Sequence, residues 1–169
     1  MQHDCTPQAR AGDSLPHLGS TEFFNLPFDS RQELILDHFK NFTGPEDRYK
    51  ALMNLRTIPL PLSQNLLSST TLVRGCQSEM HLSTTLVDDL IHIEIFSESL
   101  ISLGLASLIF LLFHKLPPKA PFTHSLSTLS ASLDLPHLLS PGRSNGFVSM
   151  LDHLKKQLVF LLASRVKNT

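Results

Sequence analysis

Residues 100–113 read LISLGLASLIFLLF, and this stretch decides what kind of fold the chain can have. It carries no charged residue and is shorter than the roughly 20 apolar residues that a helix needs to cross a bilayer. Ser102 and Ser107 interrupt it, and Pro117 and Pro118 follow within a few positions. We therefore predict a buried core helix rather than a membrane-spanning segment.

The region before this helix has the alternation of short β-strands. Every second residue across positions 91–95 is isoleucine, a period of two that is typical of a half-buried strand. Residues 80–87 alternate more loosely, and the two aspartates at 88–89 favour a turn between the runs. Residues 70–73, TTLV, form a third short run. Three consecutive strands predict an antiparallel three-stranded sheet, because sequential strands usually pair with their neighbours.

Helical patterns flank the strand region on both sides. Gly104 costs about 1 kcal/mol relative to alanine inside a helix, so we expect it to allow close packing against the sheet. Ser97 and the pair Asp29 and Ser30 stand where helix caps are expected. The order of helices, strands and helices predicts an α+β fold with the helices packed on one face of the sheet. Besides the central helix, the predicted helices cover residues 30–42, 45–55, 123–132 and 140–166.

The composition fits one small globular domain. The 169 residues are 41% hydrophobic, which suffices for a core, and a net charge of −1 does not favour nucleic acid or an anionic membrane as a partner. We predict a domain over residues 30–169 and a flexible extension over residues 1–29 that touches it through Phe23, Phe24 and Phe28. Two cysteines, and an N-terminus without a basic and apolar signal, favour a cytoplasmic protein.

Cys76 is the candidate functional residue. It lies between two strand-like runs, after Gly75 and before Gln77 and Ser78, so its thiol is expected on a loop held by rigid flanks. A lone cysteine is more often an inert buried side chain, but polar neighbours are unusual for a residue that serves packing alone. The other cysteine, Cys5, lies in a polar N-terminal stretch.

Two other chemistries compete for this cysteine. A zinc site needs about three or four protein ligands, and His81 alone lies near Cys76 in the sequence, so a metal site is disfavoured. A cysteine hydrolase needs a histidine base beside the thiol, and nine histidines leave that possibility open. The glycines do not have the spacing of a phosphate-binding loop.

Two segments give the chain a resemblance to a known family. Residues 73–78, VRGCQS, resemble the active-cysteine segment of the SufE family, and residues 140–147, SPGRSNGF, are similar to its second signature near the start of the last helix. Residues 46–55 and 97–105 resemble two further helical segments of the family. The resemblance spans residues 30–163, with its segments in the family order, and it agrees with the predicted strands and helices.

The resemblance implies a sulfur-transfer protein rather than a stand-alone enzyme. Cys76 matches the cysteine that accepts a persulfide from a SufS-type or CsdA-type cysteine desulfurase and passes the sulfur to an iron–sulfur scaffold of the SufBCD type. Such proteins also stimulate the desulfurase, and pyridoxal phosphate belongs to that partner, so no cofactor or metal is expected here. The implied fold is a small curved antiparallel sheet with helices on one side, similar to IscU-type scaffolds. We expect a monomer or homodimer without nucleic-acid or membrane partners.

Residues around the matched cysteine are expected to contact the desulfurase. Arg143 matches an arginine associated with partner contact, and we expect it on the same face as the Cys76 loop. His81 and Phe96 depart from the family pattern, so the details of the interface are expected to differ. The further supporting residues predicted at this site are Arg74, Gly75, Gln77, Ser78 and Glu98.

A carrier of sulfur must not lose it to other thiols. We therefore expect Cys76 to be partly sheltered in the free protein and presented to the partner by movement of its loop. The alternative function is that of a binding partner that activates a desulfurase allosterically without carrying sulfur. Cys76 would then be dispensable.

Overall fold

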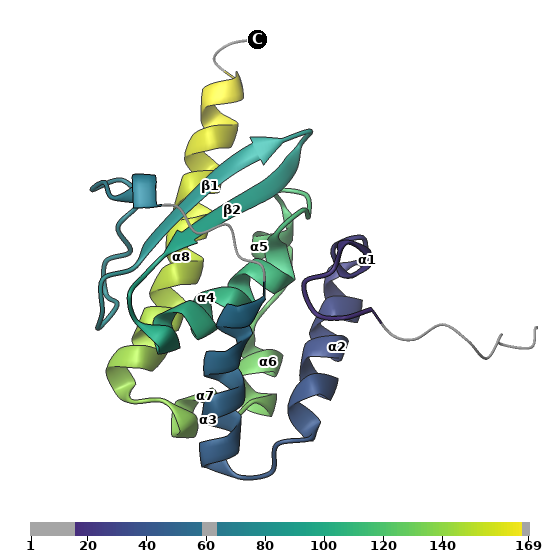
Figure 1. Cartoon of the computed structure of the whole chain (residues 1–169). Helices are drawn as coiled ribbons and strands as arrows, with labels where there is room; N and C mark the ends of the chain where they lie inside the picture. Colours follow the sequence, from purple (N-terminus) through teal and green to yellow (C-terminus); the bar gives the residue numbers. More distant parts are fainter. Residues whose placement is uncertain (1–15, 59–63, 167–169) are drawn as a thin grey trace, which may run out of the picture.

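The computed structural model describes residues 16–58 and 64–166. Its central element is α4 (Leu100–Phe113), which contacts helices on several sides and the sheet (Figure 1). Every residue of α4 after Leu100 is buried, so the predicted core helix is confirmed. Among the described residues, no helix is both long enough and apolar enough to cross a membrane.

The sheet is an antiparallel hairpin of β1 (His81–Val87) and β2 (Leu90–Phe96). Asp88 and Asp89 join the strands as predicted, and both have a left-handed backbone, with φ of 51° and 60°. Two-residue turns of this kind match the twist of the strands they connect. Alternate side chains of both strands are buried, and β1 packs on α8 (Pro141–Val166) while β2 packs on α4. The buried residues on this face are Leu82, Thr84, Ile91, Ile93 and Ile95.

The predicted third strand is wrong. Residues 70–73 contribute an isolated bridge, between Leu72 and His81, and the sheet has two strands in the described part of the chain. Directly after this short run, Gly75 has a φ of 96°, a left-handed conformation that turns the chain away from β1. The pairing of residues 70–73 is thus limited to this bridge, and they do not form a strand.

The N-terminal part of the described chain is packed on the body. Phe23 and Phe24 of α1 (Thr21–Phe24) and Phe28 at the start of α2 (Phe28–Lys40) are buried, as expected for their contact with the domain. Residues 17–29 therefore differ from the predicted flexible extension, because three phenylalanines bury apolar surface there. Residues 1–15, where the extension stays a prediction, lie outside the described residues.

Local signals set most helix boundaries, with two corrections. Pro27, not Asp29 or Ser30, is the N-cap of α2. Ser99, not Ser97, caps α4, because its side chain accepts the Ser102 N–H at 3.4 Å. The remaining elements are α3 (Pro45–Asn54), α5 (Ala120–Thr123), α6 (Ser127–Ser132), α7 (Leu135–Leu138) and the 3-10 turns η1 (Leu55–Thr57) and η2 (Gln64–Leu66).

Gly104 allows close helix packing, but against α3 rather than against the predicted sheet. A Cβ at this position would lie 2.4 Å from the carbonyl oxygen of Leu52 and 3.3 Å from the Cα of Met53. Since both atoms belong to the backbone of α3, no side-chain rotation can relieve that clash. The glycine therefore brings the two helix backbones together.

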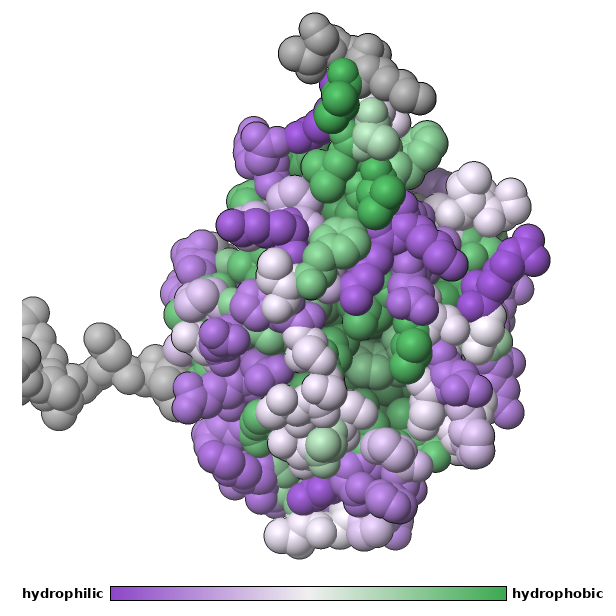
Figure 2. All heavy atoms as spheres, turned by 180° about the vertical axis from the view of Figure 1, so that it is seen from behind, coloured by the Kyte–Doolittle hydropathy of each residue, from purple (hydrophilic) through white to green (hydrophobic). Residues whose placement is uncertain are grey.

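The final helix is longer than the body it packs on. Phe147, Met150, Leu154 and Leu158 are buried, whereas the apolar side chains beyond Leu158 are mostly exposed. Figure 2 shows apolar side chains gathered toward the C-terminal end of α8. The buried stripe of α8 therefore ends at Leu158, although apolar residues continue to Val166. The exposed apolar residues in this last part of α8 are Val159, Phe160, Leu162 and Val166.

A buried arginine closes the C-terminal end of α4. Arg31 of α2 is fully buried, and its guanidinium donates to the carbonyl oxygens of Leu111, Leu112 and His114 at 3.2, 3.4 and 2.7 Å. Two more carbonyl oxygens, of Phe24 and Leu26, accept at 2.6 and 2.8 Å. A cation at a helix C-terminus is favoured by the helix dipole, so Arg31 joins α1, α2 and α4.

His114 follows α4 and is also buried. Its Nδ1 accepts the N–H of Ile93 at 3.2 Å, and its ring stacks on Phe110 with ring centres 4.4 Å apart. Burial lowers the pKa of His114 to about 4, with smaller contributions from the charges of His92, Lys115 and Arg31. The imidazole is therefore neutral near pH 7.

Candidate functional site

The candidate site is the loop of residues 74–80, which carries Cys76. Its base is formed by two backbone hydrogen bonds: the Val73 N–H donates to Met80 O at 2.8 Å, and the Leu82 N–H donates to Thr71 O at 2.9 Å. The loop is therefore attached to the start of β1 and extends from there toward α8.

Gly75 sets the path of the loop. Its φ of 96° is one that other residues rarely adopt, and a Cβ there would lie 2.5 Å from Ser149 Oγ of α8. The backbone conformation favours glycine, and the missing side chain leaves room for the close approach to Ser149. The residue before the thiol thus allows the loop to lie close to α8.

Cys76 itself rests on the same helix. Its Sγ lies 3.6 Å from the carbonyl oxygen of Gly146, a long contact for a weak S–H donor, and the residue is half-buried. Burial raises the pKa of the Cys76 thiol to about 11. At pH 7 only about one thiol in 10,000 is then ionised in this conformation. The partly sheltered thiol that the sequence predicted is present, and it is held in its unreactive form.

The start of α8 lies beside the loop. A Cβ on Gly142 would meet the side chain of Gln77 at 3.5 Å, and Ser140 Oγ donates to Gln77 Oε1 at 3.4 Å. Arg143 lies between Gly142 and Gly146, which adjoin Gln77 and Cys76, and its place on the face of the loop stays a prediction. Its guanidinium carbon lies 5.9 Å from the ring centre of Tyr49 in α3, a cation–π contact.

Three of the other predicted contact residues line two hollows of the surface. Ser78 and Glu98 line one of about 440 Å³ together with Glu79 and Phe96. Arg74 lines a second, of about 290 Å³, whose other charged residues belong to α8. The first hollow carries carboxylates and the second is mainly cationic. The charged or titratable side chains from α8 in the second hollow are Asp152, His153 and Lys156.

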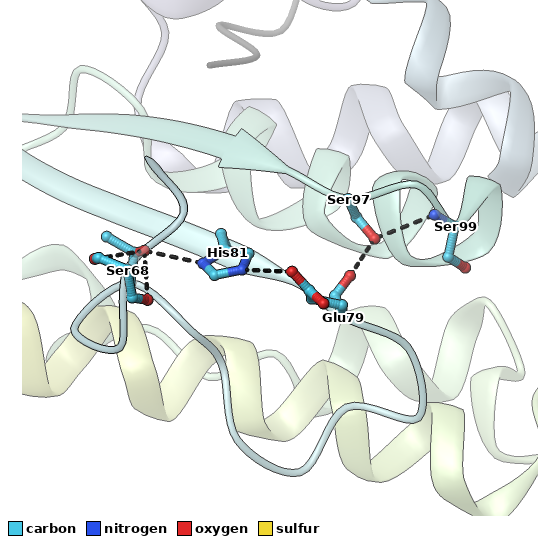
Figure 3. Close-up of polar contacts among 6 residues, drawn as sticks. Ser68, Glu79, His81, Ser97 and Ser99 are labelled. Atoms are coloured by element: carbon cyan, nitrogen blue, oxygen red, sulfur yellow. Dashed lines mark hydrogen bonds and ion pairs between the residues drawn. The ribbon is translucent and has the colours of Figure 1, made fainter. Parts of the chain in front are cut away.

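The hydrogen bonds of His81 were not predicted from the sequence. His81 is buried between Thr71 and Glu79, and Figure 3 shows its ring in a series of polar contacts at the base of the loop. No local spacing indicates this series, because Thr71 and His81 are ten positions apart and meet only through the bridge between residues 72 and 81.

Two observations bear on the competing chemistries near the thiol. Within the described part of the chain, no group of three or more histidine, cysteine or acidic residues could hold a metal ion. The contact that Cys76 Sγ makes is with a backbone carbonyl, not with the histidine base that a thiol hydrolase needs. Cys5 lies outside the described residues.

Two comparisons with known proteins agree with this picture. Residues 33–158 match the model of the family described as SufE, Fe–S metabolism associated domain. The fold is similar to the solution structure of a hypothetical protein from Thermus thermophilus, with a TM-score of 0.64 and 15% sequence identity. That similarity covers 79% of this chain and 96% of the other. At such low identity the structural similarity supports the fold alone.

Proposed function

The chain belongs to the SufE family, which is associated with Fe–S metabolism, and from this premise we propose that it is a sulfur acceptor that carries a persulfide on Cys76. The sulfur comes from a SufS-type cysteine desulfurase, which the protein also stimulates, and goes to an iron–sulfur scaffold of the SufBCD type. The observation that carries the proposal is a half-buried thiol on a loop, with one long contact from its sulfur to α8.

The transfer step is a thiol–persulfide exchange. The Cys76 thiol loses its proton, and the thiolate attacks the outer sulfur of the desulfurase persulfide. A new S–S bond forms on Cys76 as the S–S bond of the desulfurase breaks, and the desulfurase cysteine leaves as a thiolate that takes up a proton. Atoms and electrons balance without an added oxidant, and the rate depends on the thiolate fraction and on access.

The sheltered conformation supports this role. With a pKa of about 11, Cys76 is a poor nucleophile while it rests on Gly146. Movement of the loop into water removes the burial that raises the pKa, so the thiol regains its ordinary acidity when it is presented. This movement breaks the weak hydrogen bond from Sγ and the 3.4 Å bond between Ser140 and Gln77, so it is cheap compared with unfolding.

The surroundings of the loop suit a docked protein partner. Arg143 and Arg74 offer guanidinium groups to carboxylates, while Glu98 offers the opposite charge. Gln77 and Ser78 lie on the loop between them. Pyridoxal phosphate would be bound by the desulfurase. We assign no cofactor to the described residues of this chain in the transfer step. We place the reaction in the cytoplasm, where thiols are kept reduced.

Persulfide trapping tests the proposal. The full chain is incubated with a SufS-type desulfurase and cysteine, and the trapped persulfide is located by mass spectrometry. Cys5→Ser is expected to retain the label and the stimulation, and Cys76→Ser to lose the label. Label retained in the Cys76→Ser protein contradicts the proposal. Stimulation without any label on Cys76 of the natural sequence would instead establish the allosteric activator.

A further inference from the structure

The base of the Cys76 loop is held by side chains as well as by backbone. His81, the first residue of β1, is 4% exposed, and both of its ring nitrogens have partners (Figure 3). Nδ1 lies 3.0 Å from Thr71 Oγ1, and Nε2 lies 3.0 Å from Glu79 Oε1. Thr71 lies in the segment that enters the loop, and Glu79 lies in the segment that leaves it. One imidazole ring therefore connects these two segments, which we call the arms of the loop.

The chemistry of the three groups fixes which atom donates. An ionised carboxylate only accepts, so Nε2 carries the proton and donates it to Glu79. In that neutral tautomer, Nδ1 accepts a hydrogen bond from the Thr71 hydroxyl. Ser68 Oγ, 3.1 Å from Thr71 Oγ1, can donate to that oxygen in turn. Thr71 thus donates to the ring and can accept from Ser68, and Glu79 accepts from the ring.

The series also reaches the start of the central helix. Ser97 Oγ donates to the carbonyl oxygen of Glu79 at 2.6 Å and accepts the N–H of Ser99 at 3.2 Å. Ser99 caps α4, whose residues are buried. Glu79, in the arm that leaves the loop, is therefore hydrogen-bonded to the segment that begins α4. Through its bond with Thr71, the His81 ring links the arm that enters the loop to the same segment.

The two ends of the loop differ in how firmly they are held. At the tip, Cys76 has one 3.6 Å contact from sulfur. At the base, the His81 ring adds two bonds of ordinary length to two backbone bonds. We propose that His81 is a positioning residue for sulfur transfer, whose two ring hydrogen bonds hold the loop closed and so limit how often Cys76 is exposed. The inference rests on the proposed function of Cys76.

A loop that opens too often leaks sulfur. When a small thiol meets an exposed Cys76 persulfide, its thiolate attacks the outer sulfur and the S–S bond to Cys76 breaks. The Cys76 thiolate then takes the proton that the small thiol released, and the sulfur leaves as a persulfide of that small thiol. Closure by His81 slows this loss without altering the exchange chemistry.

The test measures exposure of the thiol directly. In a Cys5→Ser background, Cys76 is alkylated with iodoacetamide in the free, full-length protein at neutral pH and at several low urea concentrations. His81→Phe removes both bonds and keeps a ring, and is expected to react about tenfold faster, because two hydrogen bonds are lost. Thr71→Val and Glu79→Ala each remove one of the two hydrogen bonds of the His81 ring and are expected to react about threefold faster.

His153→Phe is the matched control. Its ring nitrogen Nε2 also bonds in the same region, to Leu82 O at 3.1 Å, but it does not connect the arms of the loop. Its labelling rate is expected to stay within about twofold of the parent, since the loop restraint is intact. The faster labelling of the His81 variant should hardly depend on urea, because local opening exposes little surface.

Two results overturn the inference. One is a His81→Phe rate equal to that of the parent; the other is a rate that rises steeply with urea from the lowest concentration, which indicates global unfolding. If His81→Phe does not fold, the two single-bond variants decide by the same criteria. Alkylation needs no desulfurase, so this result stands apart from persulfide trapping. Where trapping succeeds, dithiothreitol should remove sulfur from the His81→Phe persulfide about tenfold faster.

Discussion

Arg31 and Cys76 are two polar side chains that both contact backbone carbonyl oxygens, and their surroundings differ in opposite directions. Arg31 is fully buried and donates to five carbonyl oxygens from two separate parts of the chain. Cys76 is half-buried and has one long contact to a single carbonyl. Each environment is built mainly from backbone oxygens, but the number of bonds differs.

The difference separates what is permanent from what can move. Burial lowers the pKa of Arg31 to about 10, so it stays charged near pH 7 and its donors remain matched to the carbonyls. Burial raises the pKa of Cys76 to about 11, so it stays neutral and is easily released. A group with five bonds fixes the fold, whereas a group with one weak bond can change its exposure at little cost.

The largest effect is expected from removing the arginine. Arg31→Met leaves several buried carbonyl oxygens without a donor, so the free energy of unfolding should fall by about 3 kcal/mol or more. Urea denaturation measures this loss. Persulfide labelling of the folded fraction should be unchanged, since Cys76 does not contact Arg31.

Arg48→Met provides the matched control. Arg48 donates from Nε to the carbonyl oxygen of Phe42 at 2.9 Å, a single bond of the same type. Its loss should cost about 1 kcal/mol. If the two variants lose equal stability, the number of carbonyl bonds does not explain the role of Arg31 and the comparison fails.

The next effect concerns acid. The pKa of His114 is about 4 in the folded chain and 6.5 for an unperturbed histidine, so below pH 6.5 the unfolded chain binds the proton more readily. Stability should therefore be fully present above pH 6.5 and be lost as the pH falls toward 4, by up to about 3 kcal/mol. Urea midpoints measured across this window give the slope.

His114→Gln isolates that contribution. The variant should be less stable at pH 7, because the ring contacts are lost, but its urea midpoint should change less between pH 6.5 and 4. His38 and His153, whose pKa burial also lowers, keep a residual slope of the same sign in both proteins. Equal slopes in the variant and the parent would assign the acid sensitivity to other groups.

The smallest effect is expected at Arg143. Arg143→Ala should lower stimulation of a desulfurase about three- to tenfold if the guanidinium pairs with the partner. Loss of the contact with Tyr49 should cost about 0.5–1 kcal/mol of stability, and alkylation of Cys76 in the free protein should stay nearly unchanged.

Tyr49→Leu removes the ring and leaves the charge. Stimulation retained in that variant and lost in Arg143→Ala identifies the guanidinium as the contact. Stimulation lost equally in both variants shows that Arg143 acts by packing on α3. The arginine then has a structural role, as Arg31 does.

The same contrast explains what could be predicted from the sequence. The central helix, the two-aspartate turn and the cysteine segment at 73–78 depend on neighbouring residues, so local patterns indicate them. Arg31 meets Leu111 across 80 positions, and the pairing of Cys76 with Gly146 spans 70. Such contacts have no local signature, which is why the arginine cap and the carbonyl under the thiol were not predicted.

The errors have a similar origin. The third strand was predicted from the β-like residues 70–73, but Gly75 turns the chain after a single bridge. Gly104 was correctly expected to allow close packing, whereas the partner it meets, α3, depends on the tertiary arrangement. The role of His81 follows from the fold, since Thr71 becomes its neighbour only through that bridge.

The position of α4 in the chain has a consequence for synthesis. Its apolar residues end at Phe113, and Leu158, the last buried residue of α8, is 45 positions further on. At about 5–20 residues per second, a ribosome needs roughly 2–9 seconds to cover that distance. During this interval the most hydrophobic segment of the nascent chain lacks part of its cover, so chaperones that recognise apolar segments have time to bind it.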